Sequence, residues 1–242
     1  MRSSHQQVRS DTKSAAFGSR FGRRRTSGFE RVVVLALLAV WLTGCQQFIV
    51  LSYLLGGPPS IEPDFDTQTG ESMSKPNVKV AVVGYAPPEL QWNFPQIHQE
   101  VAAALAYSMG QHKIKVAHPD YVRAWVDEHR DWEDPAEIGR AFKCQYVVVV
   151  EINAFTLYEE GSTTLYRGKT EVFATVTKVD AEGHGDKIYT KSLEFAFPTK
   201  VPRSAYEQPL QSFKREFLSR LSEKLGWLFF ESYQGDQIPW VS

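Results

Sequence analysis

The stretch of sequence that decides the fold is CQYVVVVEINAFTLY, residues 144–158. Its first half is rich in β-branched valine and is apolar on both faces, which is typical of a strand inside a covered sheet. Such a strand needs neighbouring strands and at least one layer of helices. We therefore expect it to form the middle of the domain, with the other elements arranged around it.

The segments that follow this strand predict two more strands and a helix. Leu165–Val179 alternates apolar and polar residues, and so does Lys187–Phe197, as in strands with one buried face. Ala181–Asp186 contains two glycines and an aspartate and predicts the hairpin between them. Ala205–Phe230 repeats apolar residues every three or four positions, which predicts an amphipathic helix.

The segments that precede it predict a strand, a loop and a helix. Val78–Gly84 is a short β-branched run typical of a buried strand. The proline-rich loop Tyr85–Trp92 offers few backbone N–H groups, which argues against a phosphate-binding loop. Pro95 opens a helix that we expect to end at Gly110.

Between these two halves we expect a short strand and two helices. Ile114–Val116 is the strand, and the first helix begins near Asp120. Asp134 followed by Pro135 is a strong start signal for the second helix, because aspartate caps a helix and proline suits its first position.

The resulting order is β-α-β-α-α-β-β-β-α. It predicts an α/β chain of the α+β-like kind, with a single mixed β-sheet and helices mainly on one face. We assign this binding domain to residues 77–233 and a tail to residues 234–242. Residues 45–76 comprise a short apolar segment and then Ser60–Pro76, which is polar and proline-containing and predicts a flexible linker.

The amino-terminal part of the chain predicts export and a membrane anchor. A basic, disordered extension precedes the apolar run Val32–Leu42, which ends in Leu42, Thr43, Gly44 and Cys45. This ending resembles the lipobox of bacterial lipoproteins. The resemblance implies that residues 1–44 are a signal peptide and that Cys45 carries the lipid.

An uncleaved signal anchor is the alternative, since Val32–Leu55 is long enough to span a bilayer if the two glutamines at 46 and 47 are included. Both alternatives place the domain outside the cytoplasm, facing the periplasm, because the arginines stay inside. Gln46 after the cysteine favours the outer membrane as the location of the lipid anchor.

Charge and cysteine content narrow the function. Residues 1–44 hold 8 of the 27 basic and 2 of the 28 acidic residues, so the remainder carries 19 basic and 26 acidic residues, a net charge of −7. This balance argues against nucleic-acid binding. If Cys45 is lipidated, Cys144 is left without a disulfide partner and packs as a small apolar side chain.

The span from Val78 to Phe230 resembles the α/β domain of the TolB amino-terminal, CsgG and LpoB group of envelope proteins. The likeness rests on Val78–Val83, on Glu137–Phe142 leading into Tyr146–Ile152, on Tyr166–Lys169, and on the hairpin at 179–185. This resemblance implies a binding or assembly protein without catalytic residues or a cofactor. The long membrane-inserting segments of the secretion pore are not evident in this sequence.

Tyr85, Trp92 and Phe94 crowd one loop and are our candidate partner-binding residues, since exposed aromatic clusters anchor protein partners. Two further clusters hold polar residues. His112, His118 and Asp120 could together hold a metal, and Glu151 with Asn153 could line a cleft, but solvated or structural roles are commoner for both clusters, so we predict no metal site.

We expect a non-enzymatic, membrane-anchored lipoprotein that binds another envelope protein. A subunit of an oligomeric envelope secretion assembly is the first alternative. An envelope hydrolase using Glu151, His112 or His118 as acid or base is the second.

Overall fold

The computed structural model describes residues 60–233, which belong to one compact unit. The expected signal peptide, the lipobox at 42–45, the apolar run at 48–55 and the tail at 234–242 lie outside the described residues. In chain order the elements are β1 (Ser60–Ile61), α2 (Asp64–Thr69), β2 (Lys79–Tyr85), α3 (Pro88–Asn93), α4 (Ile97–Gln111), β3 (Lys115–Val116), α5 (Pro119–Glu128), α6 (Pro135–Phe142), β4 (Tyr146–Tyr158), β5 (Leu165–Val179), β6 (Gly185–Phe197), β7 (Arg203–Ser204), α7 (Leu210–Gly226) and β8 (Ser232–Tyr233).

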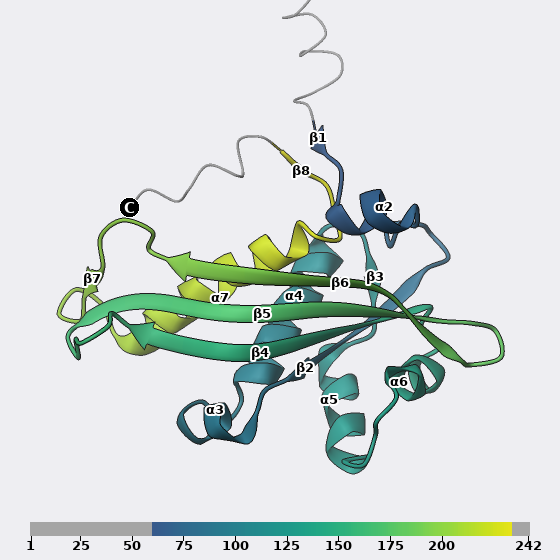
Figure 1. Cartoon of the computed structure of the whole chain (residues 1–242), viewed down its shortest axis with the longest axis horizontal. Coiled ribbons are helices and arrows are strands. Elements are labelled where there is room, and N and C mark those ends of the chain that lie inside the picture. The colour runs from purple at the N-terminus through teal and green to yellow at the C-terminus, as the bar shows by residue number, and fades with distance from the viewer. Residues whose placement is uncertain (1–59, 234–242) are drawn as a thin grey trace, which may run out of the picture. The chain divides into compact units, whose positions relative to one another are not determined.

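The expected single mixed sheet is confirmed. Its strand order is β3-β2-β4-β5-β6, and the short β7 pairs with β5. β2 runs parallel to both β3 and β4, whereas β5 runs antiparallel to its two neighbours, β4 and β6. Figure 1 shows the three long antiparallel strands side by side, with α4 and α7 behind them.

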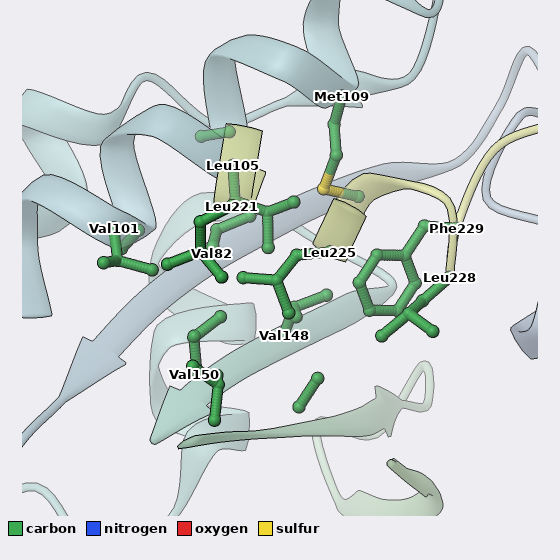
Figure 2. Packing of buried hydrophobic residues seen from close by; sticks show 14 of the residues in the cluster. Val82, Val101, Leu105, Met109, Val148, Val150, Leu221, Leu225, Leu228 and Phe229 are labelled. Atoms are coloured by element: carbon green, nitrogen blue, oxygen red, sulfur yellow. The ribbon is translucent and has the colours of Figure 1, made fainter. Parts of the chain in front are cut away.

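The larger core lies between the sheet and the helices α4 and α7. Figure 2 shows Val82, Val148 and Val150 of the sheet facing apolar side chains of both helices. In each of these helices the buried residues recur every four positions, which places them on one face. The repeats are Ile97, Val101, Leu105 and Met109 in α4, and Phe213, Phe217, Leu221 and Leu225 in α7; Ala102, Ala106, Ser222 and Gly226 are buried beside them.

Gly168 of β5 allows α7 to lie against the sheet. A Cβ atom at this position would lie 2.1 Å from the Phe217 ring, far inside van der Waals contact. Any larger residue at 168 would therefore push α7 away from the sheet.

A smaller core covers the opposite face of β2 and the beginning of β4. Ala81, Val83 and Val147 pack there against Val122 of α5 and Ile138 of α6. The first half of β4 is thus buried on both faces, as its valine run predicts.

The start and stop signals in the sequence locate the helices correctly, but some helices begin or end a few residues from the expected position. The Asp134 side chain accepts a hydrogen bond of 2.9 Å from the Ala136 N–H and caps α6 as expected. Gly110 lies within α4, whose C-cap is His112. α7 begins at Leu210, after Pro209, rather than at Ala205.

The flexible linker expected at 60–76 is wrong for this segment. Phe65 of α2 and Met73 are both fully buried, and β1 pairs with β8 near the other end of the described chain. The Phe65 ring packs edge-on against Tyr146 and Tyr189, with ring centroids 5.7 and 5.5 Å apart. These few apolar side chains fix the segment to the sheet despite its polar composition.

Two carboxylates strengthen this attachment. Asp64 accepts a hydrogen bond of 2.7 Å from the Tyr189 hydroxyl and forms an ion pair of 3.1 Å with Lys191. Glu71 is bonded to the Tyr146 hydroxyl and to Lys178. Burial acts against ionisation of both carboxyls, but the hydrogen bonds to them outweigh it and lower the pKa of Asp64 and of Glu71.

Candidate partner-binding surface

The short helix α3 presents an aromatic side chain at one end of the sheet. The sequence from Tyr85 to Trp92 predicts a loop, but the structure has the helix α3 from Pro88 onward. Pro87 caps it in an extended conformation, and Pro88 suits the first helical position because its φ is already near the helical value. Gln91 Nε2 donates to the Ala86 carbonyl at 2.6 Å, and the Phe94 N–H closes the turn onto Leu90 at 3.0 Å.

The three aromatic residues predicted to bind a partner differ in their exposure to solvent. Trp92 is 80% exposed and Tyr85 is 49% exposed. Phe94 instead packs edge-on against Phe155, with ring centroids 4.8 Å apart, and joins the larger core. Phe94 therefore holds α3 against the sheet, while Trp92 and Tyr85 remain free to contact another molecule.

Tyr85 extends this surface onto the sheet. In the strand register Tyr85 pairs with Glu151 of β4, and Glu151 pairs with Phe173 of β5. Paired residues lie on the same face of a sheet, so these three side chains form one row. Glu151 and Asn153 are exposed on this face rather than lining a closed cleft.

A bulge in β4 shapes the same face further along. The register shifts between Ile152 and Ala154, so Ala154 is exposed while Phe155 returns to the core. A shallow groove follows, between β4, β5 and β6. It is lined in part by Ala154, Thr156, Lys169, Glu171, Glu194 and Ala196. The surface beside Tyr85 is therefore an accessible sheet face of mixed polarity, which suits a protein partner better than a small buried substrate.

His112 and His118, the two histidines considered as metal ligands, make contacts within the domain. His112 stacks on Phe230 with ring centroids 3.7 Å apart. His118 Nδ1 accepts a bond of 3.3 Å from the Asp120 N–H at the start of α5. Within residues 60–233 no group of three or more potential metal-ligating side chains comes together.

Cys144 packs as expected. The side chain is buried in the smaller core, and burial raises the pKa of its thiol to about 11. The thiol is therefore protonated at neutral pH and is a poor nucleophile.

The sequence did not identify the open face of β4, β5 and β6 as part of this surface. The signal was present in the polar residues that alternate with apolar ones along these strands. Alternation alone does not say whether a second layer covers the polar side, however.

None of the helices within the described part of the chain is long and apolar enough to cross a membrane.

Comparisons with known proteins give only distant likenesses. No protein-family model matches the chain, and no curated protein matches its sequence. Among solved structures, a PelC dodecamer variant from Paraburkholderia phytofirmans is 14% identical, with 66% of this chain and 93% of that chain covered and a TM-score of 0.39. A lipoprotein, GNA1162 from Neisseria meningitidis, is 11% identical, with 61% and 97% covered and a TM-score of 0.37.

A hypothetical protein from Chlamydia trachomatis is 14% identical, with 62% and 95% covered and a TM-score of 0.37. At these identities and TM-scores the likenesses carry no conclusion about function. The resemblance to TolB, CsgG and LpoB stays a prediction from the sequence.

Proposed function

We propose that this chain is a non-enzymatic, membrane-anchored lipoprotein whose domain binds another protein of the cell envelope through the end of the sheet that carries Trp92 and Tyr85. The observation that carries the proposal is the exposure of Trp92, which is 80% accessible on a helix fixed by Phe94. Tryptophan and tyrosine are the residues most enriched among the strong contributors to protein interfaces. Because Phe94 already fixes the helix, binding needs to order only the Trp92 side chain, which limits the loss of conformational entropy.

The lipid anchor at Cys45 and the surface that carries Trp92 can be used at the same time. From Cys45 to Ser60 the chain has 60 − 45 = 15 residues, which can span about 50 Å at most. α2, which follows β1, contacts β6, whereas α3 contacts β4. Figure 1 shows α2 and α3 on opposite sides of the long strands, so the described chain begins, at β1 and α2, away from the helix that carries Trp92.

Lipidation is tested by fatty-acid labelling. We expect the native chain to take up a fatty-acid probe and Cys45→Ser to take up none, whereas Cys144→Ser should still be labelled. Labelling of Cys45→Ser, or a native polypeptide whose mass still includes residues 1–44, would refute the lipid anchor and favour the signal anchor.

Partner binding is tested by substitution of the exposed tryptophan. Trp92→Ala should lower the amount of co-purifying envelope protein by about 30-fold or more, the effect of losing a contributor of 2 kcal/mol. Its melting temperature should stay within 2 °C of the parent, because the side chain buries little surface within the domain. Tyr107→Ala, at a 70% exposed tyrosine of α4, is the matched control and should keep the partner.

A subunit of an oligomeric envelope assembly is the second candidate. β6 has 13 residues and is the last strand in the order of the main sheet, and a long edge strand is a template for pairing with another chain. Light scattering of the purified protein separates the two candidates. A single closed oligomer would favour this alternative, and a monomer at all concentrations would exclude it.

A further inference from the structure

The short length of β3 leaves space beside the end of β2. β3 pairs only with Lys79 and Val80, so no described strand flanks that edge of β2 from Val82 onward. α4 leaves β2 over one face of the sheet, and α5 follows β3 over the other face. The two helices thus lie on opposite faces of the sheet, beside the carboxyl ends of two parallel strands, which is where open α/β sheets bind their ligands.

A cavity of about 190 Å³ occupies this place between α4 and α5. Its apolar lining comes from both helices and from β2, and includes Val82, Val83, Ala103, Val122 and Val126. A dry apolar cavity of about 150 Å³ is enough to hold benzene. The space therefore accommodates one aromatic ring or one branched aliphatic group.

Gly84 keeps the inner end of this cavity rigid. A Cβ atom at this position would lie 1.9 Å from the carbonyl oxygen of His98 in the first turn of α4. The backbones of β2 and α4 are therefore in direct contact, and the distance between the walls is set by main-chain packing rather than by flexible side chains.

The charges around the cavity leave one carboxylate unpaired. Glu100 forms an ion pair of 2.5 Å with Lys214 of α7, and Asp120 lies 3.6 Å from Arg123. Asp127 is exposed on the same face of α5 as Asp120 and Arg123. Its carboxylate has no ion pair or side-chain hydrogen bond within residues 60–233.

His98 does not compensate this negative charge. Burial lowers the pKa of His98, which outweighs the opposite effect of Asp127, so the imidazole is neutral at pH 7. Its Nδ1 atom is buried without a hydrogen-bond partner among the described residues. The cavity thus combines apolar walls, an unsatisfied polar atom and one free negative charge.

We propose that this crevice is a binding site for a small organic cation, whose compact apolar group enters the cavity between α4 and α5 while its ammonium group pairs with Asp127. An anion of the same size would be repelled by the Asp127 carboxylate, and a neutral molecule would not gain the ion pair. Neither Trp92 nor Tyr85 lines the cavity, so we expect substitutions of its lining to leave partner binding unchanged.

Methyl NMR of the full chain tests the site with phenethylammonium as the probe. The uncharged analogue 2-phenylethanol and the anion 3-phenylpropanoate are the comparison ligands. We expect saturable shifts of the Val82, Val83, Val122 and Val126 methyl groups with the ammonium probe. The alcohol should bind about fivefold more weakly, because an exposed ion pair contributes up to about 1 kcal/mol, and the anion weaker still.

Two variants separate the charge from the cavity. Asp127→Asn should weaken the ammonium probe about fivefold and leave the alcohol unchanged, while Glu128→Gln, one residue further along α5, should change neither. Ala103→Leu should fill the cavity and abolish both shifts. The proposal is overturned if the probe causes no saturable shift, if the alcohol or the anion binds as tightly as the ammonium, or if Ala103→Leu binds like the parent.

Discussion

Replacing Phe65 with alanine tests whether residues 60–76 belong to the folded domain. The Phe65 side chain is fully buried and contacts the rings of Tyr146, Tyr189 and Phe229. Truncating a buried phenylalanine costs about 3–5 kcal/mol, since both transfer free energy and packing are lost. For a domain of this size we expect the melting temperature to fall by about 6–20 °C.

The assay is urea unfolding of residues 58–242, followed by circular dichroism, on the parent, Phe65→Ala and the control Ser74→Ala. Ser74 lies in the same segment but is exposed, so its substitution should change the free energy of unfolding by less than about 0.5 kcal/mol. If Phe65→Ala were as mild as Ser74→Ala, the segment would be a linker after all. The attachment described above would then be refuted.

Two further predictions concern local interactions. Asp134→Ala should lower the free energy of unfolding by about 1 kcal/mol through loss of the α6 cap. Asp134→Asn and Asp134→Ser should keep most of that stability, because both side chains can cap a helix. Equal losses for all three substitutions would argue against a capping role. The folded pKa of Asp64 is lowered, so its contribution is fully present above the unfolded pKa of about 3.9 and is lost as pH falls through the folded value. Asp64→Asn should therefore destabilise the domain at pH 7 more than at pH 2, as unfolding curves at both pH values would reveal; an equal loss at both would assign the effect to shape rather than charge.

The long strands were predictable because their patterns are long and consistent. β4 combines a doubly apolar half with an alternating half, and β5 alternates buried and half-buried residues over most of its length. The segment at 60–76 was not predictable for the opposite reason. Phe65 and Met73 stand alone among polar residues, and they are buried only because β4, β6 and the carboxyl-terminal residues after α7 provide a pocket of aromatic rings.

The candidate surface was predictable in residue type but not in exposure. Trp92 and Trp125 are the same residue type, yet Trp92 is exposed, whereas Trp125 packs beside the smaller core and stacks on His129 with ring centroids 4.3 Å apart. The sequence predicted the short strand at 114–116, but no pattern in it indicates that this short strand leaves a crevice beside β2.

The central claim is that the Trp92 end of a membrane-anchored domain contacts another envelope protein. Photocrosslinking in intact cells, from a crosslinking amino acid at position 92 and, as control, at position 107, tests it most directly. The account predicts one dominant crosslink from position 92 to a different envelope protein and none from position 107. No crosslink from position 92, or the same neighbours from both positions, would contradict it.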